Sequence, residues 1–207
     1  LLPFSVILPS APREGIVINT PEMRLYFYSK NKQNKKASVT VYPISIGRRD
    51  WATPLTETRV TSRVANPSWY PPESIRAEHA ARGDLLSKVV PAGSDNPLGS
   101  YLLALDIPGY FIHGTNKRFG IGMQVTHGCI RMYPEHIEEL YNHAVNSTPV
   151  VIINQPFKVG WLDEQLYLEV HHPLELDGHT QVTNHPDIID TLSSIIQKQP
   201  EVIIDWT

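Results

Sequence analysis

A single thiol lies between histidine and glycine residues near the middle of the chain. Cys129 is the only cysteine among 207 residues, and it ends the run Thr126-His127-Gly128-Cys129. Sixteen residues upstream, His113 precedes Gly114. A thiolate is a strong nucleophile, and a neighbouring imidazole is a common means of forming it near neutral pH. Glycine beside the thiol lets backbone N–H groups approach the oxyanion that forms on an attacked carbonyl. These residues predict acyl transfer through Cys129.

The elements that must position these residues are mostly strands. Runs of β-branched and aromatic residues predict strands at 15–19, 23–28, 39–46, 59–64, 101–105, 110–113 and 149–153. His113 thus falls at the end of a strand, where a side chain can face a cleft and still be held rigidly. Residues 134–144 predict a short helix after the thiol, because Pro134 suits a first turn and the following apolar residues share one face.

A long segment rich in proline separates the predicted strands of the first half from His113. Residues 47–100 hold one clear strand and a short predicted helix at 74–82, and their prolines are Pro54, Pro67, Pro71, Pro72, Pro91 and Pro97. Long irregular segments inside compact domains are often lids. Trp69 is then an apolar wall of a cleft. The alternative is an ordered surface excursion with Trp69 packed beneath it.

Composition excludes several classes of partner. The net charge is −3, with 18 basic and 21 acidic residues, so no basic field suggests nucleic acid. No apolar run is long enough to span a bilayer. One cysteine excludes an internal disulfide and a multi-cysteine metal site.

Together the two motifs resemble the L,D-transpeptidase family, which has a YkuD-type catalytic domain. The family pattern is a histidine with a small residue after it, a gap, then Ser/Thr-His-Gly-Cys, an apolar residue and Asn or Arg. His113 and residues 126–131 match it, with Arg131 standing where many members carry asparagine. Gly120-Ile121-Gly122 is similar to the periplasmic branch that includes enzymes attaching an outer-membrane lipoprotein to peptidoglycan.

The resemblance implies a mainly β fold, a β-sandwich or curled sheet with a short helix after the nucleophile. It covers residues 12–155, the expected catalytic domain. Residues 1–11 are expected to be a linker remnant that ends a LysM module. Residues 156–207 are expected to form a small α+β tail, with strands at 165–170 and 202–204 and a helix at 186–198. The resemblance also implies a periplasmic location, a signal sequence lying outside the given chain, and no cofactor.

The family's chemistry assigns roles to five residues. Cys129 attacks the L,D bond after the third residue of a peptidoglycan tetrapeptide stem, D-alanine leaves, and the acyl group passes to an amine. That amine belongs to another stem or to a lipoprotein lysine. His113 accepts the thiol proton while the Gly114 carbonyl holds its second nitrogen. Backbone N–H groups at Gly128 and Cys129 receive the oxyanion, and His127 either contacts substrate or shapes the turn.

A second set of residues is expected to contact the substrate. Arg131 suits a carboxylate because its guanidinium is a planar fork, although a structural ion pair is an equal alternative. Thr126 is more often a local hydrogen-bonding residue in such a turn. The full set is Arg131, Asn116, Phe119, Thr126 and Trp69.

Other functions remain open from the sequence. The same cysteine could pass the acyl group to water, which would make the protein an L,D-carboxypeptidase or hydrolase. Nine histidines invite a zinc-dependent peptidase or amidase, but no His-Glu-x-x-His pattern is present, so we expect no metal site. A lone cysteine is more commonly a buried structural residue, yet its setting beside His127 and Gly128 argues against that here.

Overall fold

The computed structural model describes residues 7–30, 37–162, 165–172, 174–176, 179–180, 189 and 192–193. The predicted strand at 202–204 lies outside the described residues, as does the predicted helix at 186–198 apart from residues 189, 192 and 193. None of the helices in the described ranges is long and apolar enough to cross a membrane.

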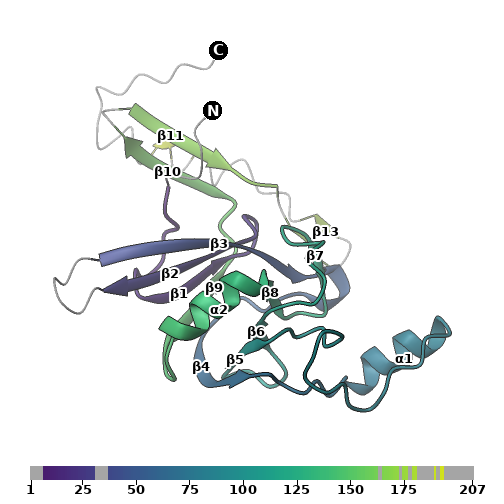
Figure 1. Cartoon of the computed structure of the whole chain (residues 1–207). Helices are drawn as coiled ribbons and strands as arrows, with labels where there is room; N and C mark the ends of the chain where they lie inside the picture. The colour runs from purple at the N-terminus through teal and green to yellow at the C-terminus, as the bar shows by residue number, and fades with distance from the viewer. Residues whose placement is uncertain are drawn as a thin grey trace.

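Strands dominate the described structure, so the predicted mainly β fold is confirmed (Figure 1). The main sheet contains β1 (Gly15–Asn19), β2 (Arg24–Lys30), β3 (Ala37–Gly47), β4 (Thr56–Ala65), β5 (Tyr101–Leu105), β6 (Phe111–His113), β7 (Gln124–Thr126), β8 (Ile130–Met132) and β9 (Pro149–Ile153). The helices are α1 (Glu73–Ala81) and α2 (Pro134–His143), with a 3₁₀ turn η1 (Arg49–Trp51) after β3. The strands β7 and β8, which flank the Cys129 turn, were not predicted.

The main sheet closes on itself through its longest strand. Its order is β2-β1-β9-β4-β5-β6-β8-β3-β7, and β3 also pairs with β2. The first part of β3, from Ala37 to Pro43, pairs with β2, whereas Ile44 and Ser45 pair with β8. Figure 1 shows the result as two layers, with β1 to β3 above β4 to β6. This curled, sandwich-like sheet matches the predicted fold class.

The space between the layers is filled by aliphatic side chains from the strands and from α2. Ile112 of β6 and Ile130 of β8 lie opposite one another in a parallel pair, and both are fully buried. Ile137 and Leu140 extend this core from the predicted apolar face of α2. Because side chains alternate along a strand, His113 and Arg131, the next pair in the register, lie on the other face.

The segment from Pro67 to Pro97 is ordered by a buried asparagine. Asn96 donates to the carbonyls of Pro67 (2.8 Å), Val90 (3.3 Å) and Pro91 (3.1 Å), and is itself fully buried. Trp69 and Val90 exchange two backbone hydrogen bonds of 2.8 Å. The helix α1 lies between Trp69 and Val90 in the chain and confirms the helix predicted at 74–82. It stands at the margin of the molecule in Figure 1.

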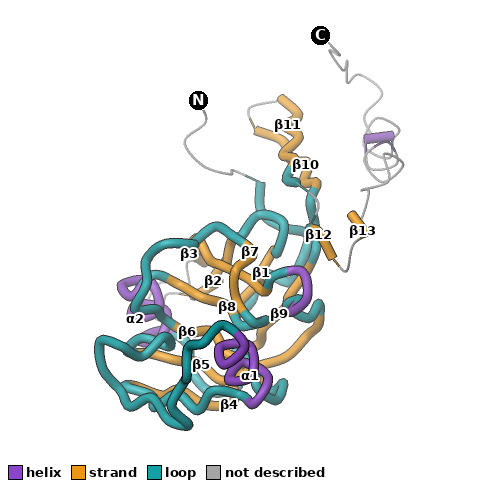
Figure 2. Tube along the Cα trace, turned by 90° about the vertical axis from the view of Figure 1, so that its right-hand side faces the viewer, coloured by secondary structure: helices purple, strands orange, loops and turns teal. Residues whose placement is uncertain are grey.

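Beyond the main sheet, β10 (Phe157–Leu162) and β11 (Gln165–Val170) form an antiparallel hairpin. The predicted strand at 165–170 is therefore confirmed, while β10 and the two-residue strands β12 (Glu175–Leu176) and β13 (His179–Thr180) were not predicted. Figure 2 shows the β10–β11 hairpin set apart from the body of the molecule. Lys158 attaches it, because its buried ammonium donates to the Ile7 carbonyl at 2.6 Å and lies 3.0 Å from Glu22 Oε2.

Candidate active site

The turn that carries Cys129 is held by two hydroxyl groups. Thr126 ends β7, and its buried hydroxyl donates to the Cys129 carbonyl at 2.6 Å. Thr53 Oγ1 donates to the Gly128 carbonyl at 2.8 Å. Gly128 has φ +96°, and a Cβ there would lie 2.8 Å from Tyr110 Cε1. Only glycine fits this position without strain.

His113 ends β6 and is almost completely buried. Its Nδ1 lies 2.7 Å from the Gly114 carbonyl oxygen. A carbonyl can only accept, so Nδ1 carries the proton and Nε2 is the acceptor nitrogen of the ring. Burial, reinforced by the charge of Arg131, lowers the pKa of His113 to about 4. The imidazole is therefore neutral near pH 7 and able to accept a proton.

Cys129 lies directly before β8, one strand away from His113. Its thiol donates to the Gly109 carbonyl at 3.5 Å. Burial raises the pKa of the Cys129 thiol to about 11, against smaller opposing effects of a backbone hydrogen bond from Phe111 and the charge of Arg131. The thiol is therefore protonated near pH 7 and needs a base before it can attack.

Arg131 adds a cation to the same face. Its guanidinium is partly buried, which lowers its pKa. Its Nε is buried without a hydrogen-bond partner, and no acidic side chain of the described residues forms an ion pair with it. The structural ion pair, the alternative role for Arg131, thus has no partner within those ranges.

His127 is held by residues that sequence reasoning missed. Its ring meets Trp51 edge to face, with centroids 5.2 Å apart, and its Nε2 lies 2.9 Å from Glu78 Oε2. Glu78, on α1, also accepts two bonds from Arg48, at 3.0 and 2.7 Å. Glu78 is 49 residues from His127 in sequence, and no periodicity or motif links them.

The remaining predicted contact residues lie further out. Asn116 and Phe119 are on the loop after β6, and Phe119 is 93% exposed. Trp69 is half-buried in the segment from Pro67 to Pro97. The structure thus brings Cys129, His113, Gly114, Thr126, His127, Gly128 and Arg131 together around β6 and β8, and leaves the other three on flanking loops.

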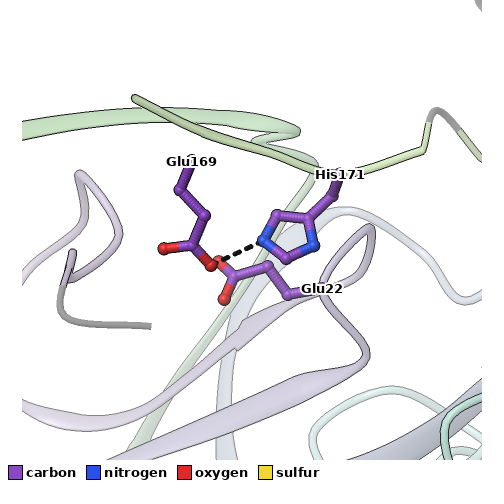
Figure 3. A group of neighbouring side chains, drawn as sticks. All are labelled: Glu22, Glu169 and His171. Atoms are coloured by element: carbon purple, nitrogen blue, oxygen red, sulfur yellow. Dashed lines mark hydrogen bonds and ion pairs between the residues drawn. The ribbon is translucent and has the colours of Figure 1, made fainter. Parts of the chain in front are cut away.

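One group of side chains outside this site has the spacing of metal ligands. Glu22, Glu169 and His171 have potential ligand atoms within 4.8 Å of one another (Figure 3). Lys158 Nζ lies 3.0 Å from Glu22 Oε2 and 3.0 Å from Glu169 Oε2, so the chain's own ammonium supplies the cation there. Among the residues that the structure describes, His113, His127, His136 and His143 belong to no such group.

Comparison with solved structures defines the class of fold. The carbamoyl enzyme that Ldtfm forms with avibactam matches with a TM-score of 0.51 and 17% identity, over 70% of this chain and 50% of that chain. This likeness shows a shared fold, that of L,D-transpeptidase catalytic domains.

Sequence comparison then gives the family. The L,D-transpeptidase catalytic domain model, YkuD, matches residues 13–152, so the chain belongs to this family of enzymes. It is 45% identical over 95% of its length to the probable L,D-transpeptidase YcfS of Escherichia coli K12, and 41% identical over 97% to the probable L,D-transpeptidase YbiS of that organism. The chain spans 61% and 65% of these relatives.

Proposed function

We propose that this chain is the catalytic part of a peptidoglycan L,D-transpeptidase with Cys129 as its nucleophile. The observation that carries the proposal is the neutral His113, whose Nδ1 is bonded to Gly114, one strand away from the only thiol of the chain. A half-buried thiol that is protonated at neutral pH needs such a base, and a neutral imidazole with an unprotonated Nε2 supplies it.

The reaction has two halves. His113 takes the thiol proton as Cys129 sulfur bonds to the carbonyl carbon of the third stem residue. The bond to D-alanine then breaks, and D-alanine leaves with that proton, which gives an acyl-thioester. In the second half an amine attacks the thioester, His113 removes the excess proton, and the proton returns to the departing sulfur.

The oxyanion of each tetrahedral intermediate would be bound by the N–H groups of Gly128 and Cys129. In the described ranges neither group donates a turn or loop hydrogen bond to the backbone. The hydroxyl of Thr53 keeps the Gly128 carbonyl turned toward β3, which supports an orientation of the turn that leaves these donors free. One such donor is typically worth about 2.7–4 kcal/mol in the transition state.

Arg131 is proposed to bind a carboxylate of the donor stem. The unpartnered buried Nε supports this role, because a partly buried guanidinium without an anion is costly until substrate supplies one. Thr126 would support the turn, while Asn116 and Phe119 would contact the stem from the loop after β6.

The segment from Pro67 to Pro97 is proposed to be a lid. It carries exposed apolar side chains at Tyr70, Leu85 and Val89, besides the half-buried Trp69. Such side chains could cover a bound stem and limit access of water to the thioester.

The acceptor and the location are extrapolated from the family. We propose a periplasmic enzyme that passes the acyl group to another stem or to a lipoprotein lysine, with a catalytic domain at 12–155 followed by a tail. Hydrolysis by the same cysteine is the second candidate, since a lid that opens early would admit water.

Incubation of the protein with purified tetrapeptide muropeptides and an amine acceptor tests the proposal, with products analysed by mass spectrometry. We expect release of D-alanine, transfer product, and no turnover by Cys129→Ala. A carbapenem should add covalently to Cys129 in the parent alone. Turnover by Cys129→Ala would exclude the cysteine mechanism, and turnover that a chelator abolishes but a thiol-alkylating agent does not would favour a zinc peptidase.

A further inference from the structure

The two histidines of the site are held as opposite tautomers. His113 donates from Nδ1 to the Gly114 carbonyl, which leaves Nε2 as its acceptor. His127 contacts the Glu78 carboxylate through Nε2 instead. An ionised carboxylate only accepts, so Nε2 of His127 carries a proton, and Nδ1 is the acceptor of the neutral ring.

Glu78 is fixed as a carboxylate by its surroundings. Hydrogen bonds from Arg48 and His127 lower the pKa of Glu78 to about 2. Arg82, directly after α1 and four residues from Glu78, also pairs with it. Glu78 therefore stays ionised, and remains an acceptor for His127, throughout the pH range in which a transpeptidase would work.

Arg48 connects this carboxylate to the Cys129 turn a second time. Its backbone N–H donates to the Thr126 carbonyl at 2.9 Å, while its guanidinium holds Glu78 with two parallel bonds. Asp50 accepts from Nε of the same guanidinium at 2.9 Å. Isolated surface ion pairs contribute little to stability. The Arg48–Glu78 pair is different, because Arg48 directly follows β3 and also contacts Thr126 of the catalytic motif, while Glu78 lies on the lid helix α1.

We propose that Glu78 is a positioning residue for acyl transfer: from the lid helix, its carboxylate orients the His127 imidazole as the Nε2–H tautomer beside the Cys129 turn. The inference rests on the proposed function, and it adds a residue outside the motif to that site. Glu78 also couples the lid helix α1 to the Cys129 turn, because its carboxylate is in contact with His127 only while α1 is docked against Arg48.

Two measurements on the full chain test the proposal. The first is the tautomer of His127, read from ¹⁵N NMR of histidine-labelled protein. Glu78→Gln should replace the pure Nε2–H pattern of His127 with a mixture of tautomers and leave the Nδ1–H pattern of His113 unchanged.

The second measurement is the rate of acyl transfer from tetrapeptide muropeptide to an amine. Misplacement of a catalytic group can cost about 10²-fold, and we expect kcat to fall by roughly tenfold, with a smaller change in KM.

Glu73→Gln is the matched control, since it removes a carboxylate from the same helix. Glu73 is exposed and pairs with Arg76 rather than with the motif, so His127 should keep its parental pattern in this variant. Glu78→Asp retains a carboxylate and should recover part of the lost rate. It also serves as the test variant if Glu78→Gln does not fold.

The proposal is overturned if His127 keeps its pattern in Glu78→Gln, or if that variant loses no more kcat than Glu73→Gln. It is also overturned if Glu78→Asp is no better than Glu78→Gln when both are folded. If the parent transfers no acyl group, the proposed function fails instead, and the NMR comparison still decides whether Glu78 holds His127.

Discussion

At the scale of single residues, burial sets the protonation states of the proposed catalytic pair. It raises the pKa of Cys129 to about 11 and lowers that of His113 to about 4. Between these values the thiol and the imidazole are both neutral. In the proposed mechanism, the thiolate is therefore not stored as an ion pair with His113 but forms as the carbonyl is attacked.

The first prediction concerns the identity of the base. At pH 7, His113→Ala should slow acylation of Cys129 by a carbapenem by about 10²–10⁴-fold, the usual contribution of a general base, and more than His127→Ala does. As pH rises toward the thiol pKa of about 11, the thiolate fraction rises tenfold per unit, so the deficit should shrink. Stopped-flow rates from pH 6 to about 10.5 measure it. A larger and pH-rescued deficit in His127→Ala would reverse the two roles.

The second prediction concerns Arg131. A hydrogen bond to a charged group contributes about 1.5–3 kcal/mol, so Arg131→Met should raise KM for the donor stem by roughly ten- to a hundredfold. No described acid loses a partner, so the melting temperature should not fall. Removing the positive charge should also raise the pKa of His113, which Arg131 now lowers. The lower limb of the pH–rate profile should therefore move to higher pH.

Arg59→Met is the control for this substitution, because Arg59 is exposed and pairs with Asp106 on the surface. It should leave both KM and the pH profile unchanged. An unchanged KM in Arg131→Met would show that the guanidinium does not bind the donor.

At the scale of elements, the proposed lid, from Pro67 to Pro97, has two anchored ends, and its helix α1 contacts the Cys129 motif. Asn96 and the Trp69–Val90 backbone pair fix its two ends, while Glu78 contacts His127 from α1. The loop between α1 and Val90 can therefore be altered without removing these contacts.

The third prediction concerns that loop. Deletion of residues 84–88 should weaken donor binding and raise the ratio of hydrolysed to transferred product, because a shorter lid excludes water less well. The rate of Cys129 alkylation by a small reagent should stay the same or increase. An unchanged product ratio with unchanged donor affinity would make the segment an ordinary surface loop, whereas lost alkylation would mean that it supports the catalytic pair structurally.

The sequence predicted the elements with long, regular patterns and missed those that are short or defined by distant partners. The strands at 15–19 and 149–153 were visible as continuous apolar runs, and α2 was visible because its apolar residues repeat with the helix period. The three-residue strands β7 and β8 are too short to show one. The Cys129 motif is local, but Glu78, Arg48 and Thr53 contact it only because the closed sheet and the segment from Pro67 to Pro97 bring them there.

At the scale of the whole molecule, a buried ion pair joins the β10–β11 hairpin to the main sheet. Lys158 is 1% exposed, and the carboxylate of Glu22 is fully buried beside the β1–β2 turn. Arg24 lies 3.7 Å from the same carboxylate. Lys158 of the β10–β11 hairpin is thus closer than Arg24 to the buried Glu22 carboxylate of the main sheet region.

The fourth prediction follows from this pair. Lys158→Met leaves the Glu22 carboxylate with a weaker partner, and removing one member of a buried pair typically costs about 3–5 kcal/mol. We expect the lower end, because Arg24 remains nearby. Urea unfolding measures the loss. The double variant Lys158→Met/Glu22→Gln should recover most of it, and a double variant less stable than the single one would show that the pair is not the cause.

The closed sheet has a consequence for how the protein is made. Along the chain β9 is the last strand of the main sheet, yet it lies between β1 and β4. Until β9 is synthesised, the edges of β1 and β4 that pair with it are therefore unpaired. Unpaired strand edges are sites of aggregation. Pairings this distant in sequence also form slowly. Cys129 and His113 are synthesised before β9. The sheet that carries them is nevertheless completed only when β9, which holds none of the proposed catalytic residues, pairs with β1 and β4.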